Sequence, residues 1–331
     1  MTQTEHGHPG TPSSGPGRPG RRRRRAEQLM VPDVEFTSYY GRPVIKEPVW
    51  KAPDVPGYLF FGGLAGASSV LAAGAGLSGY GELARVAKIG ALGGIGLSAV
   101  ALIHDLGRPD RFLNMLRVFK PSSPMSMGSW LLIAYGPLAG AAAVSDVTGI
   151  LPAAGGAATA GAALFGPAIA TYTAALICDT AVPGWHEGHR EMPYLFVGSA
   201  SCAAAGLGLL TMPPAAAAPA RTLATVAAPA ELVAKRLLLR RLGDIAEPYE
   251  TGRPGRLLRA AELLTVGGLA GAVLGRRNRA VSALAGASLL AASALTRFGV
   301  FEAGMATARD PKYTIVPQRR RRDRAADRGM N

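Results

Sequence analysis

The sequence predicts an all-α polytopic membrane protein, a bundle of eight transmembrane helices. The first observation is that apolar stretches of roughly 18–25 residues recur along the chain, which is the length that crosses the hydrocarbon core of a bilayer. The second observation is the composition: the 331 residues are 48% hydrophobic but only 6% aromatic, and 43 of them are glycine. Such small residues fill a soluble core poorly, whereas in lipid they let helices approach closely.

The chain before the first apolar stretch has two parts. Residues 1–29 are rich in Gly, Pro, Ser and Arg, which predicts a disordered basic tail. No apolar run follows these arginines, so no signal peptide is expected. Residues 30–56 hold aromatic side chains among prolines and are predicted to form an extended arm. This arm either docks on a partner subunit or anchors the first span at the membrane interface.

Eight spans follow in a transmembrane domain predicted over residues 57–303. The sixth and seventh are the least apolar, because Pro229 and Glu231 interrupt the former and further charges lie at their edges. Residues 304–331 are predicted to form a basic cytoplasmic tail. The spans are expected near residues 57–77, 86–103, 129–147, 157–177, 193–212, 217–237, 257–274 and 280–303.

The positive charges predict how the bundle is oriented. Of the 36 Lys and Arg residues, 29 fall in the two tails and in the loops that share their side. The positive-inside rule places this side, with both termini, in the cytoplasm. The same rule explains the basic runs Arg21–Arg25 and Arg319–Arg322, so no nucleic-acid partner is predicted. Arg276, Arg277 and Arg279 lie on the opposite side, against the bias.

The numbers and positions of the cysteines and histidines limit which metal sites the chain could form. Cys178 and Cys202 lie in or beside apolar runs without CxxC spacing, and we interpret them as packing residues. A membrane haem needs two axial histidines in the bundle, and only His104 is near a span, so no haem is expected. His186 and His189 lack the i, i+4 spacing of a helical zinc site, so we predict no metal of the chain's own.

The stretch between the second and third spans is the most unusual part of the chain. Residues 104–130 read HDLGRPDRFLNMLRVFKPSSPMSMGSW and contain acids, cationic residues and three prolines. This stretch is too polar to lie in lipid. We predict an ordered loop that caps the cytoplasmic end of the bundle and supplies half of a functional site.

Ionisable side chains within or at the ends of spans are costly in lipid, so each is a candidate functional residue. With the predicted orientation they gather in the cytoplasmic half of the bundle, and Asp146 and Arg221 are the exceptions. Ion pairing at the interface or snorkelling is the alternative for each residue taken alone. Together, acids, a histidine and arginines can bind a quinone head and exchange its two protons. The gathered residues are His104, Asp105, Asp179, Glu231, Glu262, Arg297 and Glu302.

Four stretches resemble the NrfD/polysulfide reductase membrane-subunit family. The stretch 104–130 is the specific match. The supporting matches are PGYLFFGGLAGASSVLAAG (56–74), YTAALICDTAVPGWHEGHREMPYLFVGSA (172–200) and RFGVFEAGMATARDP (297–311). The resemblance implies eight transmembrane helices, a menaquinone or menaquinol site and no haem. It also implies two partners, a ferredoxin-like iron–sulfur subunit and a molybdopterin oxidoreductase subunit.

The resemblance also implies which residues handle the quinone and its protons. Where some relatives read YTG, this chain has Tyr172, Thr173 and Ala174. The arm sequence EFTSYYGRP is similar to an actinobacterial branch that is often associated with formate dehydrogenase. The residues carried over are His104, Asp105 and Arg108 of the DLGRP motif, with Tyr172, Asp179 and Trp185 of the fourth-span motif.

The predicted function is therefore a quinone-reactive subunit of a multi-subunit oxidoreductase in the cell membrane. It would exchange electrons between an iron–sulfur subunit and menaquinone, without a catalytic centre of its own. One alternative is a secondary transporter or ion-translocating protein, because buried acids and broken helices also suit one. Transporters bind near the midplane, however, whereas most acids here gather at one face. The other alternative is an inert membrane anchor.

Overall fold

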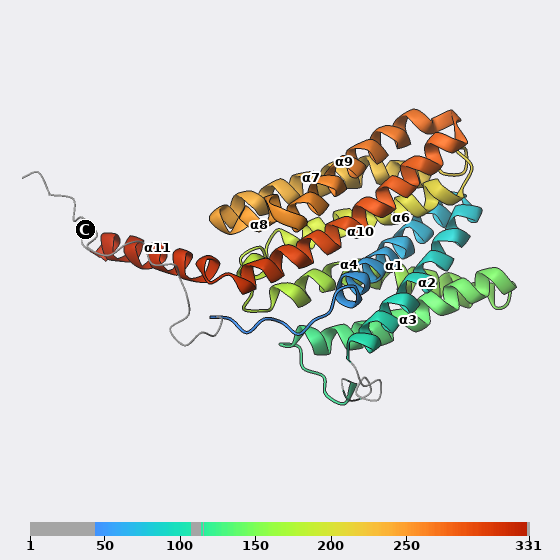
Figure 1. Ribbon diagram of the computed structural model, residues 1–331. Coiled ribbons are helices and arrows are strands. Elements are labelled where there is room, and N and C mark those ends of the chain that lie inside the picture. The colour runs from blue at the N-terminus through green and yellow to red at the C-terminus, as the bar shows by residue number, and fades with distance from the viewer. Residues whose placement is uncertain (1–43, 107–113, 115, 330–331) are drawn as a thin grey trace, which may run out of the picture. The chain divides into compact units, whose positions relative to one another are not determined.

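The computed structural model describes residues 44–106, 114 and 116–329, all within one unit, Thr37–Asn331. These residues are helical without a strand, and Figure 1 shows their long helices side by side. Seven of these helices are long and apolar enough to cross a membrane, which confirms the predicted all-helical, multi-pass membrane fold. They are α1 (Asp54–Leu77), α2 (Gly81–Asp105), α3 (Pro124–Thr148), α4 (Pro152–Cys178), α6 (Met192–Thr211), α9 (Gly252–Leu274, continued by the turn η3, Gly275–Arg277) and α10 (Arg279–Arg309).

The predicted sixth span, near 217–237, corresponds to helix α7 (Ala218–Leu242). This helix has 25 residues, yet it is not one of the seven. Glu231 interrupts its apolar sequence, and its last turn holds Arg240 and Arg241. The number of helices that qualify by length and apolarity is therefore seven in the described part of the chain, one fewer than expected.

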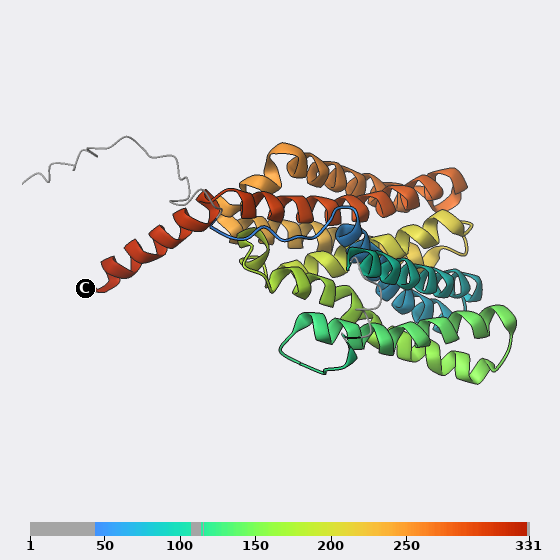
Figure 2. The ribbon, with the colours of Figure 1, turned by 60° about the horizontal axis from the view of Figure 1, so that its bottom comes forward.

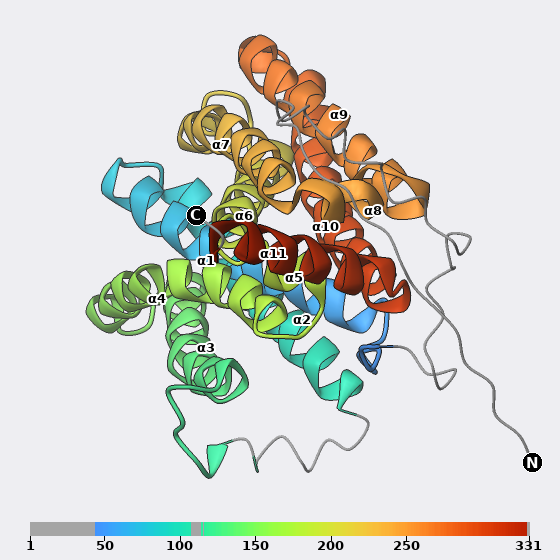
Figure 3. The same ribbon diagram turned by 90° about the vertical axis from the view of Figure 1, so that its left-hand side faces the viewer.

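The long helices form two groups of four. Helices α1–α4 pack together, as do α6, α7, α9 and α10, and α1 joins the groups through contacts with α6 and α10 (Figure 3). Figure 2 shows α3 and α4 as a hairpin within the first group. Successive helices are antiparallel, so α1, α3, α6 and α9 begin where α2, α4, α7 and α10 end. We call this the motif end, because the stretch 104–130 leaves α2 there, and the opposite end the far end.

Prolines and glycines set the bounds of several helices. Pro124, Pro152 and Pro193 lie in first turns, where the missing N–H has no intrahelical partner to lose. Gly149 ends α3 with φ of 74°, in the left-handed region that favours glycine. Short elements connect the long helices at the motif end. They are α5 (Pro183–His186), η2 (Gly243–Ala246) and α8 (Glu247–Glu250).

Small residues let α1 and α4 touch through their backbones. A Cβ atom built on Gly166 would lie 2.4 Å from the carbonyl oxygen of Gly66, and one on Gly66 would lie 2.3 Å from that of Gly166. No larger residue fits at either position unless the helices separate. This is the small-residue packing that the glycine content predicts for a membrane bundle.

We expect Gly166→Ala to lower the free energy of unfolding by about 1–3 kcal/mol, because the added methyl group forces α4 away from α1. The measurement is the thermal unfolding midpoint of the detergent-solubilised protein. Gly156→Ala is the matched control, since Gly156 is on the same helix with nothing within 4 Å of its Cβ position. Equal midpoints for the two variants would contradict the close contact.

The two ends of the predicted domain extend further than expected. Helix α1 begins at Asp54 rather than near residue 57, and α10 continues to Arg309 rather than ending near 303. In the described part of the predicted arm, residues 44–53 have no helix, whereas residues 54–56 belong to α1. The Trp50 ring of the arm stacks on Trp185 of the bundle at a centroid distance of 5.7 Å. Residues 1–43, which include the predicted disordered tail, lie outside the described residues.

The predicted C-terminal tail contains a helix, α11 (Lys312–Gly329). It follows α10 after two residues and is linked to the connection between α7 and α9. Lys312 Nζ lies 2.8 Å from Glu247 Oε2, and Arg320 forms an ion pair with Asp244. The hydrogen bond from Lys312 lowers the pKa of Glu247 from its ordinary value of 4.5, and Glu247 in turn raises the pKa of Lys312 above 10.5.

This ion pair predicts a pH window for the attachment of α11. Because the pKa of Glu247 is lowered, its carboxylate stabilises the contact above pH 4.5, and this stabilisation is lost as the pH falls through the lowered pKa. Because the pKa of Lys312 is raised, its ammonium group stabilises the contact below pH 10.5, and this stabilisation is lost as the pH rises through the raised pKa. We expect a spin label at Gln318→Cys to be least mobile between these limits. The native cysteines are buried and should not compete for the label. Lys312→Gln should remove the alkaline transition, and its persistence there would contradict the assignment.

Candidate functional site

The predicted pair His104 and Asp105 ends α2 at the motif end, where the start of α1 and the arm meet it. His104 Nδ1 lies 2.9 Å from Asp54 Oδ2, and Asp105 Oδ1 accepts a hydrogen bond from the backbone N–H of Lys51 at 3.2 Å. The His104 side chain is 73% exposed, while that of Asp54 is 14% exposed. The two motif residues therefore connect α2 to the arm and to the start of α1. Asp105 also lines a cavity.

This inner cavity lies between the arm and helices α1–α4. Its volume is about 50 Å³, enough for a few water molecules at most. Its wall is mainly apolar, with polar groups from the arm-proximal turn of α1 and from α2, α3 and α4. The polar side chains that line it are Asp54, Tyr58, Asp105, Ser129 and Tyr172, and Trp50 supplies an aromatic wall.

A larger outer cavity adjoins it on the other side of Tyr172. Its volume is about 670 Å³, within the range of small-molecule binding sites. Asp179, His186 and His189 give it one polar wall, and apolar residues of α3 and α4 give it another. His186 Nδ1 contacts the Cys178 carbonyl at 3.2 Å. The structure thus brings together Asp105, Tyr172 and Asp179 around two neighbouring cavities.

Tyr172 is the side chain common to the two cavities. A Cβ atom on Gly128 of α3 would lie 1.9 Å from the Tyr172 hydroxyl oxygen, so only glycine leaves room for the ring in this position. Tyr58 interacts with the Tyr172 side chain. Sequence reasoning missed Tyr58 and Gly128. The signal for Tyr58 was its place four residues after Asp54, on the same face of α1.

Trp185 lies behind the cavities rather than in their walls. It is completely buried, and its Nε1 donates a hydrogen bond to the Val300 carbonyl at 2.9 Å. Its ring packs between Trp50 and Phe301, with both centroids 5.7 Å away. Trp185 therefore supports the Trp50 wall of the inner cavity. Arg108, the remaining motif candidate, lies outside the described residues.

Glu231 and Arg297 belong to a second polar location, the central polar cluster, formed by α6, α7 and α10 away from both cavities. Glu231 is 3% exposed and accepts a hydrogen bond from Thr296 at 3.1 Å. Arg297 is fully buried, donates to the Phe196 carbonyl at 2.7 Å and lies 3.7 Å above the Phe196 ring. Cys202 also neighbours Glu231. One oxygen of Glu231 and two nitrogens of Arg297 have no hydrogen-bond partner in the described chain.

The remaining two candidates, Glu262 and Glu302, form ion pairs near the motif end. Lys235 Nζ lies 2.8 Å from Glu262 Oε2, and Arg253 Nη2 lies 3.3 Å from Glu302 Oε1. These contacts join α7 to α9 and α9 to α10. Ion pairing is the alternative that the sequence left open for such residues, and neither acid lines a cavity described above.

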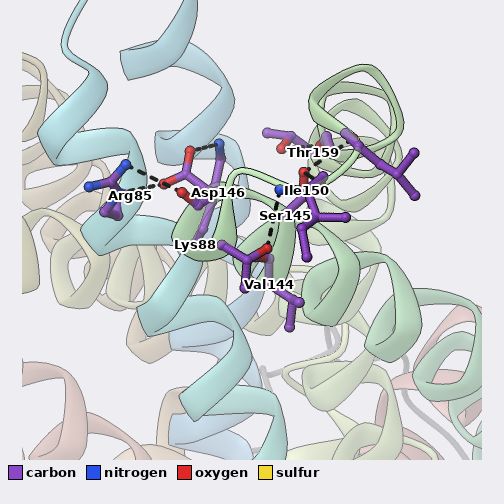
Figure 4. A network of polar contacts seen from close by, with 10 residues as sticks. Arg85, Lys88, Val144, Ser145, Asp146, Ile150 and Thr159 are labelled. Atoms are coloured by element: carbon purple, nitrogen blue, oxygen red, sulfur yellow. Dashed lines mark hydrogen bonds and ion pairs between the residues drawn. The ribbon is translucent and has the colours of Figure 1, made fainter.

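Several of the charges at the far end have structural partners. Arg85 and Lys88 of α2 both reach Asp146 of α3 at 2.8 Å, as Figure 4 shows. Arg221 donates to the Ala272 carbonyl in the last turn of α9 at 2.9 Å. Arg279 donates to the last-turn carbonyls of α6, to Leu209 at 3.2 Å and to Leu210. Cations at helix C-termini satisfy free carbonyls and the helix dipole, which accounts for Arg221 and Arg279 on this side.

The architecture and these cavities define the class: a multi-pass helical membrane protein with two neighbouring cavities, lined in part by polar side chains, at one end of its first helix group. Within the described chain, no group of three or more His, Cys, Asp or Glu side chains is placed to hold a metal ion. The family model described as polysulphide reductase, NrfD, matches residues 44–222, just over half of the chain. The chain belongs to the NrfD family. No curated protein matches it.

Proposed function

We propose that this chain is the quinone-reactive membrane subunit of a multi-subunit oxidoreductase. It would exchange electrons between an iron–sulfur subunit and menaquinone or menaquinol. The observation that carries the proposal is the pair of cavities that share Tyr172, with Asp105 on one side and Asp179 on the other. The family match supports it, because residues 44–222 contain both cavities.

The outer cavity has the chemistry that a quinone requires. A quinone head presents two carbonyl oxygens, to which the Tyr172 hydroxyl can donate a hydrogen bond. The Nδ1–H of His186 is directed to the Cys178 carbonyl, so the other ring nitrogen can accept a hydrogen bond from a quinol hydroxyl, while the apolar wall accommodates a tail. Oxidation of the quinol releases two electrons and two protons. The carboxylates Asp179 and Asp105 are suited to accept the protons, and the electrons would pass to the oxidised clusters of the partner subunit.

The finer features of the assembly belong to the same proposal. We take α7 as the sixth of eight spans, since it is long enough and lies between α6 and α9. Both termini and the motif end would be cytoplasmic in the cell membrane, which the charge bias supports. The partners would be a ferredoxin-like iron–sulfur subunit and a molybdopterin subunit. The formate dehydrogenase association rests on the arm sequence EFTSYYGRP alone.

The test is menaquinol-linked turnover of the purified complex with Asp105→Asn or Tyr172→Phe. We expect each change to lower turnover on the order of 100-fold, the size of a lost proton-transfer or hydrogen-bonding group. Turnover with a soluble redox dye, which bypasses this subunit, should not change.

Tyr194→Phe is the matched control for the tyrosine variant. Tyr194 is 73% exposed near the same end of the bundle, outside both cavities, so its loss should leave turnover unchanged. Wild-type rates in both test variants would contradict the quinone site and favour an inert anchor.

A further inference from the structure

A third concave surface, which we call the lateral groove, lies between α6 and α7 of the second helix group. Its volume is about 430 Å³, and its wall is almost entirely apolar. Val226, Val233 and Leu237 of α7 are 66%, 55% and 48% exposed along it. In a membrane protein, such a face meets lipid or another apolar chain.

The groove is aligned with a set of arginines at the motif end. Its α7 wall repeats every three or four residues through Val226, Ala230, Val233 and Leu237, so these side chains form one stripe. The next positions on this stripe are Arg240 and Arg241. On the other wall, the groove residue Tyr194 lies in the first turn of α6, and Arg190 lies two residues before this helix begins. Each wall of the groove therefore leads to an arginine at the motif end.

The charge at this end of the groove is incompletely neutralised. Arg241 lies 3.3 Å from Glu191 and also donates to the Glu187 carbonyl at 2.8 Å. Arg190 and Arg240 are exposed and have no ion pair within the described residues. Three arginines, Arg190, Arg240 and Arg241, outnumber the two acids, Glu187 and Glu191. This leaves a net positive charge where the apolar groove ends.

We propose that the lateral groove binds one acidic phospholipid. An acyl chain would fill the groove between α6 and α7, and the phosphate would lie against Arg190 and Arg240. Charge complementarity decides between the occupants. A quinone head is neutral and would make no use of the arginines. A helix of another chain would need an acidic residue of its own at the level of the arginines. An acidic lipid matches both parts, because its acyl chain is apolar like the groove and its head is negative where the groove ends at the arginines.

The test is native mass spectrometry of the full chain, reconstituted in nanodiscs of phosphatidylcholine with phosphatidylglycerol and then released into detergent. We expect retained phosphatidylglycerol to exceed retained phosphatidylcholine. Arg190→Gln with Arg240→Gln should weaken retention of phosphatidylglycerol about fivefold for each arginine removed. Ala230→Phe, which fills the groove from an exposed position, should abolish retention while the protein still inserts and folds.

Two matched controls separate this site from general charge and bulk effects. Arg256→Gln with Arg259→Gln removes two exposed arginines at the same end of α9, outside the groove. Ala270→Phe adds the same bulk at another exposed helix position. Equal retention in the test and control variants would overturn the proposal.

The choice of occupant is tested by the same preparation. Equal retention of the neutral and acidic lipids would overturn the role of the arginines. The two native cysteines are buried, so Val226→Cys gives a single exposed thiol for cross-linking in native membranes. A protein–protein cross-link at this position would assign the groove to a second chain instead of a lipid.

Discussion

Gly128→Ala is expected to lower menaquinol-linked turnover of the complex on the order of 100-fold, although residue 128 carries no reactive group. The added methyl group would occupy the position of the Tyr172 ring, whose Cζ lies 1.8 Å from the Cβ site. The ring must therefore leave the wall between the inner and outer cavities. A displacement of about 1 Å at a reacting group is enough for an effect of this size.

Gly136→Ala provides the control for this substitution. Gly136 lies on the same helix, α3, and nothing is within 4 Å of its Cβ position. We expect wild-type turnover from this variant and equal membrane yield from both. If Gly128→Ala retains wild-type turnover while Tyr172→Phe loses it, the hydroxyl matters but its position in the wall does not.

The second large effect is expected in the central polar cluster. Glu231→Gln leaves the buried Arg297 without its nearby counter-charge, and we expect the free energy of unfolding to fall by about 3 kcal/mol. Arg297→Met should have a similar cost, because Glu231 is then the isolated charge. The double variant should recover most of the loss, since replacing both charges removes the uncompensated group. Thermal unfolding in detergent measures all three variants.

The comparison for these variants is Arg253→Gln, which breaks an ion pair with Glu302 whose arginine side chain is 73% exposed. Exposed pairs contribute less than about 1 kcal/mol, so this variant should unfold close to the wild type. Additive losses in the double variant would show that Glu231 and Arg297 are not coupled. Losses no larger than that of Arg253→Gln would show that the cluster does not stabilise the fold.

The fold could be predicted from the sequence because lipid makes a strong demand on composition. A spanning helix needs about 20 mainly apolar residues, and this pattern is visible without any tertiary information. Helix α7 shows where the criterion weakens. Its Glu231 is buried among other helices, and its arginines lie in the last turn, at the motif end. A hydropathy window shows neither the burial nor the position at the end of the bundle.

Residues of the candidate site could be predicted only where a motif marks them. Asp105, Tyr172 and Asp179 do line the two cavities. Tyr58 was missed because a tyrosine in an apolar span is usually a core residue, and Gly128 because one glycine among 43 carries no signal. Contacts between residues far apart along the chain, such as those of Asp54 with His104 and of Glu231 with Thr296, require the tertiary fold.

The polar contacts of charged side chains are distributed differently in the two helix groups, so the groups should differ in how well they tolerate a substitution. In the second group, several separate side chains join the helices at both ends, so the loss of one leaves the others intact. These redundant links start from Arg221, Lys235, Arg241, Arg253 and Arg279. In the first group, both Arg85 and Lys88 depend on the single carboxylate of Asp146. One substitution of Asp146 therefore removes both ion pairs that join α2 to α3 in the described residues, within the group that contains the cavities.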